Sequence, residues 1–319
     1  MDYTLLLIVV LLVVIGLVIL YSTSAYNGQV KFHDSFYYLK KQAFATVLGI
    51  VLMLFVAGMD YHIWQRLAVF GYLAAVALSV AVMLFGREIN GSKRWLALGP
   101  FSFQPSEFAK VALILFLADL VTKNVKTIGK MWTLCRIMFW ILPIVGLVGA
   151  SNLSTAIIIL GIGVILIFVA SPKYAQFALM GIAGACFMGI FLALESYRLE
   201  RLAIWRNPEK YEKGYQTLQG LYAIGSGGVF GVGIGNSVQK LGFVPEAQND
   251  MIFSIICEEL GLAGAGIIVF LFLLLIWRFF LIASGSRDLF GALIATGAMA
   301  HMMIQVILNI AVVTNTIPN

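Results

Sequence analysis

The sequence predicts an all-α polytopic membrane protein, and two observations support that fold class. The first is composition. Of the 319 residues, 61% are hydrophobic and 11% are charged, and the mean hydropathy is +0.97. A soluble domain is usually about half apolar and about a quarter charged. The second is a series of apolar stretches close to the roughly 20 residues that a helix needs to cross a bilayer. A transmembrane β-barrel would instead show short segments of alternating hydrophobicity.

Nine membrane-spanning helices are predicted, near residues 4–22, 42–59, 65–85, 107–122, 133–150, 153–171, 175–195, 251–283 and 289–314. One long connection, residues 196–250, separates the seventh span from the eighth. We expect a single integral membrane domain over residues 1–319. The first span is too long for a removed signal peptide and lacks its small-residue cleavage site.

The charges do not establish the orientation of the chain in the membrane, but they restrict the kinds of molecule that it can bind. The net charge is +6, but the basic residues of the short loops are nearly balanced between the two sides, so the positive-inside rule does not decide. The sequence carries no basic stripe of the kind that binds nucleic acid. Basic residues near 85–110 and 196–240 suit anionic lipid head groups or a phosphorylated substrate. The three cysteines fall inside predicted spans, where we interpret them as small packing residues rather than metal ligands.

Polar residues collect first in REINGSKRWLALGPFSFQPSEFAK, residues 87–110. Its end is typical of a helix start, with Pro105 in the first turn, Ser106 able to cap and Glu107 at the positive end of the helix dipole. Glu107 and Lys110 are three residues apart, so they share a face and can pair. Two interpretations stay open: a capping acid with a snorkelling lysine, or a charged pair that meets a substrate.

The second collection is the connection 196–250, where aromatic, amide and charged residues alternate with glycines. A loop of this length is usually functional or disordered, and its apolar residues favour order. Its GSGGVFGVGIG run fits neither a P-loop nor a dinucleotide site. Glycines that permit a tight re-entrant turn at the membrane surface are the better interpretation.

The last predicted span carries a polar stripe. His301, Gln305 and Asn309 recur every four residues and therefore share one helix face. Such a face is expected to point into the bundle or toward a wet cavity. Interhelical hydrogen bonds, worth about 0.6–2 kcal/mol each, and direct substrate contact are the two interpretations.

Four stretches are similar to one known family: GSKRWLALGPFSFQPSEFAK, GYQTLQGLYAIGSGGVFGVGIGNSVQKLGFVPEAQNDMIF, EELG and the ending NIAVVTNTIPN. These stretches resemble the SEDS family (shape, elongation, division and sporulation), which includes FtsW, RodA and SpoVE. The resemblance extends over nearly the whole chain. The GIGNSVQK stretch is more similar to the FtsW and SpoVE branch. The resemblance implies a peptidoglycan glycosyltransferase of the bacterial cell membrane, which polymerises lipid II at the outer face for division or spore wall synthesis. It also implies a class B penicillin-binding transpeptidase as partner, and no organic cofactor.

The resemblance further implies ten membrane helices with both ends cytoplasmic, which would place both polar collections outside. The sequence departs from the family pattern in three ways. It stops at Asn319, before a proline- and glycine-rich motif and the tenth helix, and it starts at Met1 without a basic leader. Asn152, in SNLST, stands where many members carry aspartate in a P-D-L-G-T-like stretch. We therefore expect a chain that lacks the last helix, and we assign Asn152 no catalytic role.

The family's essential acid, the aspartate of a PE-x-x-x-D motif, maps onto Asp250. In the expected reaction the C4 hydroxyl of one lipid II attacks the anomeric carbon of a lipid-linked glycan, and undecaprenyl pyrophosphate leaves. An α-linked diphosphate that becomes a β-linked sugar implies inversion, which needs one base within about 3 Å of the hydroxyl. Asp250 can be that base, a ligand of Mg²⁺ or Mn²⁺ that bridges to substrate phosphates, or only an N-cap worth about 1 kcal/mol. Capping would lower its pKa and weaken it as a base. If Asp250 is the base, either Asn249 caps the helix or apolar surroundings raise the pKa of Asp250 again.

The remaining site predictions follow from charge and position. For the diphosphate we expect Lys93, Arg94, Lys110, Arg198 and Arg201, the last two with interfacial anchoring as the alternative. Further substrate-binding residues are Glu107, Gln216 and Glu246, with Glu246 also supporting the loop before Asp250. Supporting contacts are expected from Gln104, Ser106, Glu258, Glu259, His301, Gln305 and Asn309. On a straight helix Glu258 and Glu259 lie too deep to join Asp250, so we expect interior polar contacts for them, with Lys110 or the polar stripe.

Two other functions compete with the polymerase. A lipid II flippase needs a charged path through the membrane centre and usually symmetry-related repeats, and the sequence carries few such charges and no internal repeat. A non-catalytic membrane scaffold that recruits the transpeptidase is the second alternative.

Overall fold

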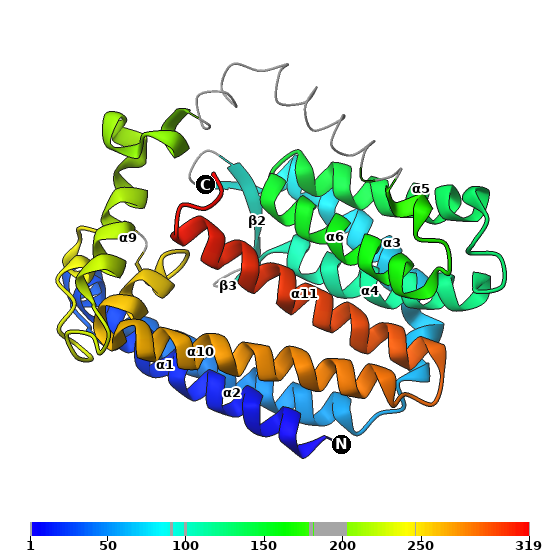
Figure 1. Ribbon diagram of the computed structural model, residues 1–319, viewed down its shortest axis with the longest axis horizontal. Helices are drawn as coiled ribbons and strands as arrows, with labels where there is room; N and C mark the ends of the chain where they lie inside the picture. Colours follow the sequence, from blue (N-terminus) through cyan, green and yellow to red (C-terminus); the bar gives the residue numbers. More distant parts are fainter. Residues whose placement is uncertain are drawn as a thin grey trace. The chain divides into compact units, whose positions relative to one another are not determined.

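The computed structural model describes residues 2–89, 92–98, 101–178, 181, 203–245 and 247–318. Its helices are α1 (Tyr3–Phe32), α2 (Tyr37–Ala57), α3 (His62–Phe85), α4 (Pro105–Asn124), α5 (Met131–Gly149), α6 (Leu153–Ala170), α9 (Tyr215–Ser226), α10 (Ile252–Ser284) and α11 (Leu289–Val313) (Figure 1). Three short strands are β1 (Arg87–Ile89), β2 (Ser92–Leu98) and β3 (Phe101–Phe103), and three single 3-10 turns lie at 208–210, 212–214 and 239–241.

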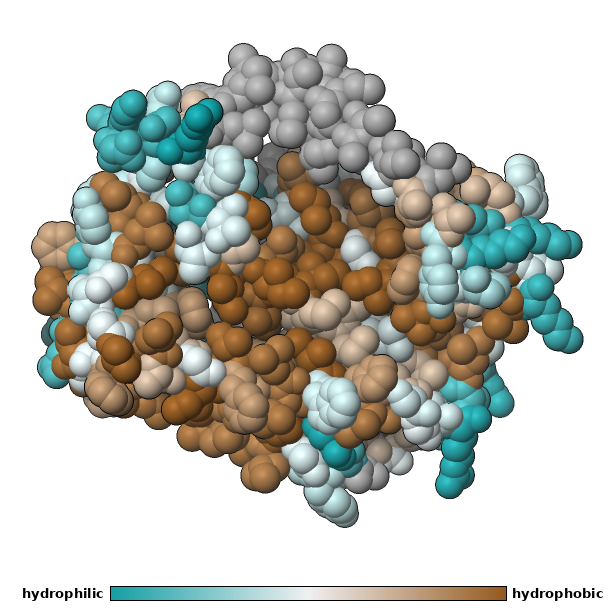
Figure 2. Space-filling view, viewed as in Figure 1, coloured by the Kyte–Doolittle hydropathy of each residue, from teal (hydrophilic) through white to brown (hydrophobic). Residues whose placement is uncertain are grey.

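The polytopic α-helical class is confirmed. Seven of the described helices are long and apolar enough to cross a membrane: α1, α2, α3, α5, α6, α10 and α11. Helix α4 also matches a predicted span, but its 20 residues include four charged side chains. The predicted span 175–195 lies almost entirely outside the described residues. Large apolar side chains such as Phe55, Phe70 and Phe270 are exposed on the spans, and hydrophobic residues cover most of the face drawn in Figure 2, as expected of a lipid-facing surface.

The chain divides into two compact units. Unit 1 comprises Met1–Gly58, Ala185–Arg278 and Val306–Asn319, and unit 2 comprises Met59–Gly184 and Phe279–Gln305. The helices α10 and α11 therefore contribute residues to both units.

Helix α4 forms the core of unit 2. Its residues Ala109, Leu113, Leu117 and Val121 recur every four positions and are fully buried, so this helix is surrounded by protein although it carries charges. The connection between α3 and α4 contains a small antiparallel sheet in the order β1-β2-β3.

Capping side chains fix several helix starts. The Asp2 carboxylate accepts the N–H of Leu5 at α1 (2.8 Å), and the Asn152 side chain accepts the N–H of Thr155 at α6 (3.2 Å). Asp288 accepts the N–H of Gly291 at α11 (2.7 Å), and this bond holds the pKa of Asp288 below its usual value. Asn152 thus serves the helix start, where asparagine is among the best caps.

In unit 1, helix α10 is broken at Gly261, where the backbone adopts φ 68° and ψ −172°. The glycine run of the connection fills the break. The N–H groups of Val232 and Gly233 donate to the carbonyls of Glu258 and Glu259 (3.0 Å each), and the N–H groups of Leu262 and Ala263 donate to the carbonyls of residues 228 and 229 (2.9 and 3.0 Å). Non-helical backbone at membrane depth is tolerated where protein groups satisfy it in this way.

Glycine is required on both sides of this contact. A Cβ added to Gly261 would lie 2.3 Å from the nitrogen of Gly231, and one added to Gly231 would lie 2.2 Å from the carbonyl oxygen of Glu259. Both residues also have positive φ, which side chains rarely tolerate. The glycine run therefore serves close backbone approach.

We predict that Gly261→Ala destabilises unit 1 by several kcal/mol, because backbone strain of about 1–3 kcal/mol adds to an overpacking cost of similar size. Thermal melting of the purified protein in detergent measures the loss. Gly266→Ala is the matched control, since the same helix leaves open space around Gly266. Equal melting temperatures for the two variants would contradict this account of the break.

Candidate active site

Asp250 lies two residues before α10 begins, and its side chain is exposed. Its backbone carbonyl accepts the Nδ2 of Asn309 (3.2 Å). Its carboxylate makes no hydrogen bond or ion pair with any residue that the structure describes. Among the described residues, the capping interpretation of Asp250 therefore finds no support.

The backbone around Asp250 is anchored in an apolar cluster. Ala247 and Met251, on either side of it, are 0% and 2% exposed and pack with Val244, Ala223 of α9 and Val313 of α11. Burial on both sides holds an exposed side chain on a fixed backbone, which is the arrangement that a catalytic group needs.

Two amides fasten the same segment. The Gln216 Nε2 of α9 donates to the carbonyl of Pro245 (3.3 Å), and the Asn27 Nδ2 of α1 donates to the Oε1 of Gln248 (3.3 Å). The structure thus places Gln216 on the loop before Asp250. Asn27 is not predictable from the sequence, because no local pattern indicates a contact across 221 residues of chain.

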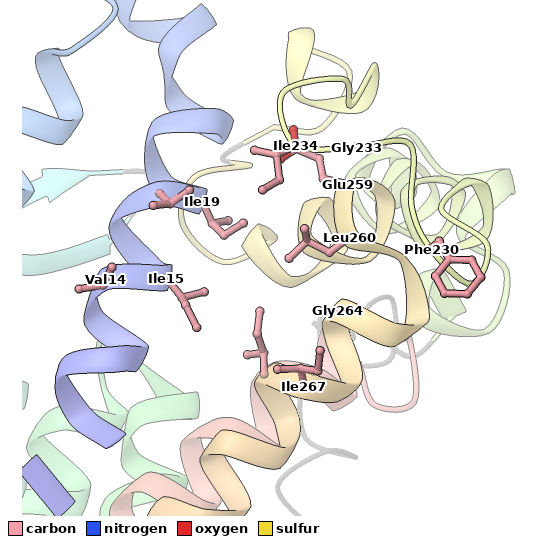
Figure 3. Close-up of a pocket in the computed structure, with 12 residues that line it drawn as sticks. Val14, Ile15, Ile19, Phe230, Gly233, Ile234, Glu259, Leu260, Gly264 and Ile267 are labelled. Carbon is pink, nitrogen blue, oxygen red and sulfur yellow. The ribbon is translucent and has the colours of Figure 1, made fainter. Parts of the chain in front are cut away.

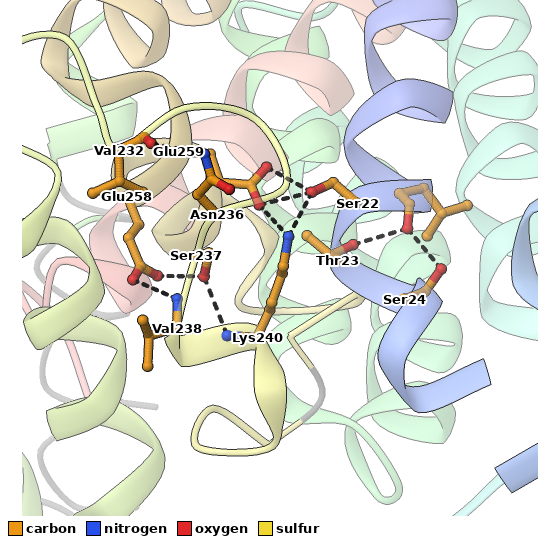
Figure 4. Close-up of polar contacts among 11 residues, drawn as sticks. Ser22, Thr23, Ser24, Val232, Asn236, Ser237, Val238, Lys240, Glu258 and Glu259 are labelled. Atoms are coloured by element: carbon orange, nitrogen blue, oxygen red, sulfur yellow. Dashed lines mark hydrogen bonds and ion pairs between the residues drawn. The ribbon is translucent and has the colours of Figure 1, made fainter. Parts of the chain in front are cut away.

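Glu258 and Glu259 make interior polar contacts, as predicted, but with other partners than Lys110 or the polar stripe. The Glu259 carboxylate accepts the Nζ of Lys240 (2.6 Å) and the Oγ of Ser22 (2.7 Å), and Lys240 also donates to Ser22 (2.9 Å) (Figure 4). Glu258 accepts the Oγ of Ser237 and the N–H of Val238 (3.0 Å). The prediction about partners was wrong because the glycine run brings the segment around Lys240 against α10.

In unit 2 the predicted pair of Glu107 and Lys110 is confirmed. The Lys110 Nζ lies 2.9 Å from the Glu107 Oε2 and 3.4 Å from the Gln305 Oε1, which also contacts the Nε2 of His301 (2.8 Å). Lys110 is 1% exposed, so it does not snorkel to water, whereas the Glu107 side chain is 54% exposed. Two residues of the predicted stripe therefore make hydrogen bonds outside their own helix: Gln305 accepts from Lys110, and Asn309 donates to the backbone carbonyl of Asp250.

The start of α4 differs from the expectation. Pro105 occupies the first turn as predicted, but the N-cap position falls on Gln104, which makes no side-chain capping bond. Ser106 lies inside the first turn and is 9% exposed, so it does not cap. Arg94 of β2 is exposed and donates from its Nε to the carbonyl of Ser151 (3.0 Å). Four predicted groups lie outside what the structure describes: Arg198, Arg201, Glu246 and the side chain of Lys93.

Comparison with known proteins decides the family. Residues 3–319 match the family model of FtsW, RodA and SpoVE, described as cell cycle protein. The chain belongs to the FtsW/RodA/SpoVE family.

The relatives of this family member cover it almost completely. It is 38% identical to stage V sporulation protein E of Bacillus subtilis, over 99% of this chain and 88% of the relative. It is 34% identical to a probable peptidoglycan glycosyltransferase FtsW of Trichlorobacter lovleyi, over 99% and 85%. A solved peptidoglycan synthase complex contains a similar chain, with a TM-score of 0.84, 27% identity and coverage of 100% and 88%. The structure of the rod shape determining protein RodA of Thermus thermophilus is also similar, with a TM-score of 0.70 and 26% identity. The match covers 98% of this chain and 84% of that RodA chain.

The donor set near Asp250 bears on the expected cation. Among the described residues, no three His, Cys, Asp or Glu side chains lie together as metal ligands. A Mg²⁺ or Mn²⁺ ion at Asp250 would find no cluster of further acidic or imidazole ligands among these residues, and Mg²⁺ commonly keeps water and substrate phosphates as ligands.

Proposed function

We propose that this family member is a peptidoglycan glycosyltransferase that polymerises lipid II, with Asp250 as its catalytic carboxylate. One observation carries the proposal. In a chain that matches the family over residues 3–319, Asp250 presents an exposed carboxylate that no described residue engages, on a backbone anchored by buried neighbours.

The chemistry assigned to Asp250 is simple. As general base, its carboxylate accepts the proton of the incoming C4 hydroxyl while that oxygen bonds to the anomeric carbon of the lipid-linked glycan. The bond from that carbon to the diphosphate breaks, and the configuration inverts. General base catalysis contributes typically about 10²–10⁴ in rate. A divalent cation held by Asp250 and the diphosphate would stabilise the leaving group.

The charged groups of unit 2 are proposed to serve the diphosphate. Arg94 is exposed, and its fork of donors suits a phosphate. Lys110 is buried, so its proposed role is to orient the exposed Glu107 carboxylate and the Gln305 amide that it contacts.

The partner and the side of the membrane are also part of the proposal. We infer that the reaction occurs on the extracytoplasmic side and that a class B penicillin-binding transpeptidase cross-links the product. The solved relative with the TM-score of 0.84 supports the transpeptidase partner, since its description joins polymerization and crosslinking in one synthase complex.

The test is a polymerisation assay. The protein is purified with its transpeptidase and supplied with labelled lipid II, and glycan strands are the expected product. Absence of strands together with scrambling of lipid II across liposomes would favour the flippase. Absence of both activities would favour the scaffold.

We predict that Lys110→Met lowers the polymerisation rate while the protein stays folded. The Glu107 side chain is 54% exposed, so water solvates its carboxylate when Lys110 is replaced and the pair costs little to break, but Glu107 loses the cation that orients it. Polymerisation rate and melting temperature are measured together, with Lys126→Met, at an exposed position after α4, as control. Full activity of Lys110→Met would contradict the orienting role.

A further inference from the structure

Helices α1 and α10 of unit 1 are tied together at two levels. Near one end, Asp2 pairs with Arg278. Near the other, Ser22 donates to Glu259, which also holds Lys240. Since the start of α1 meets the late part of α10 and the late part of α1 meets its early part, the two helices run antiparallel between these bridges.

Between the bridges lies a cavity of about 560 Å³. Figure 3 shows α1 on one side of it, α10 on the other, and the glycine run closing it at one end. Its walls include Ile15 and Val18 of α1, Ile267 of α10 and Ile234 of the glycine run. Its volume falls within the roughly 300–1,000 Å³ typical of small-molecule sites.

All three walls belong to candidate membrane spans or are hydrogen-bonded to one. Both helices are candidate membrane spans. The glycine run bonds to the backbone of α10 at residues 258–263, six to eleven residues beyond Ile252, which is roughly 9–16 Å along the helix at about 1.5 Å per residue. Phe230 and Ile234 of this run are 85% and 56% exposed, as suits contact with hydrocarbon.

The residues that line the cavity indicate which kind of ligand it can bind. Glu259 is the one ionisable residue among the described residues that line the cavity, and it is already engaged by Lys240 and Ser22. None of the described lining residues is a cation, so the cavity does not suit the head group of a polyprenyl diphosphate. It suits a chain without polar groups.

The size favours a slender chain over a protein helix. A helix about 10 Å wide would fill 560 Å³ within roughly 7 Å of its length, little more than one turn. We propose that this cavity is a binding site for one acyl chain of a bilayer phospholipid. The chain fills the space between two helices that the polar bridges hold, and it supports the glycine run. This proposal does not depend on the catalytic role of Asp250.

The test uses a photoreactive lipid. The full chain is placed in phosphatidylcholine nanodiscs that contain a small fraction of phosphatidylcholine with a diazirine on one acyl chain, and adducts are mapped by mass spectrometry after illumination. We expect adducts on the peptides of Val18 and Ile267 well above those at Leu273, which is exposed on α10 but outside the cavity.

A filling variant sharpens the result. Ile267→Trp is expected to lower the Val18 adduct severalfold, whereas Leu273→Trp leaves it unchanged, with melting temperatures confirming that both variants are folded. Equal labelling at Val18 and Leu273, or an Ile267→Trp variant that labels as wild type, would overturn the proposal. Loss of the adduct when polyprenyl phosphate is added, or a protein cross-link from a photoreactive residue at position 18, would overturn it in favour of those occupants.

Discussion

Asp250→Asn is expected to abolish detectable glycan polymerisation while the protein remains folded. The carboxylate has no partner among the described residues, so its loss breaks no contact there, and the backbone contact of Asp250 with Asn309 is retained. An amide cannot accept the proton of the attacking hydroxyl, so the rate should fall by about 10²–10⁴. The measurement is strand formation from labelled lipid II, together with the melting temperature of each protein.

The control for this variant is Asp34→Asn. Asp34 is also in unit 1, in the connection between α1 and α2, and it is paired with Lys40 of α2 (2.7 Å), away from the candidate site in sequence. The Asp34→Asn variant should polymerise lipid II as the wild type does.

A chelator separates the two roles of Asp250. If Asp250 holds a cation, polymerisation stops with chelator and returns with Mg²⁺ or Mn²⁺. If Asp250 acts as base alone, chelator has no effect.

The second large effect is expected at the buried pair of Lys240 and Glu259. Lys240→Met leaves Glu259, which is 0% exposed, without its cation, and breaking one side of a buried pair costs about 3–5 kcal/mol. Glu259→Met likewise leaves the buried Lys240 without its carboxylate partner, and a similar loss of stability is expected. The double variant should recover most of the loss, because two apolar side chains replace both charges. Thermal melting in detergent measures all three variants.

An exposed pair is the matched control for the buried one. Lys40 and Asp34 are 69% and 34% exposed in their side chains, and such surface pairs are worth about 0–1 kcal/mol. Lys40→Met should therefore change the melting temperature little. If Lys40→Met and Lys240→Met lost the same stability, or if the double variant were as unstable as the singles, the anchoring role of the Lys240 pair would be wrong.

Local patterns predicted much of the fold. Hydropathy located the eight described long helices, because crossing a bilayer requires a continuous apolar run. Spacing predicted the pair of Glu107 and Lys110 and the shared face of His301 and Gln305, because helix geometry alone brings residues three or four apart together.

Contacts between distant segments were not predictable in the same way. Ser22 meets Glu259 across 237 residues of chain, and no periodicity indicates such a pairing. The break in α10 depends on Gly231 and Gly261 being pressed together; each glycine is visible in the sequence, but their contact is not. Asp250 was predicted as the catalytic residue from the resemblance to a family motif. Its position in the sequence alone favoured the N-cap and the general base equally.

The role of Asp250 is decided by polymerisation of labelled lipid II by the purified protein with its transpeptidase, wild type beside Asp250→Asn. Glycan strands are expected from the wild type and none from Asp250→Asn at equal folded concentration. Strands of equal yield from both proteins, or lipid II scrambling by a wild type that makes no strands, would contradict it.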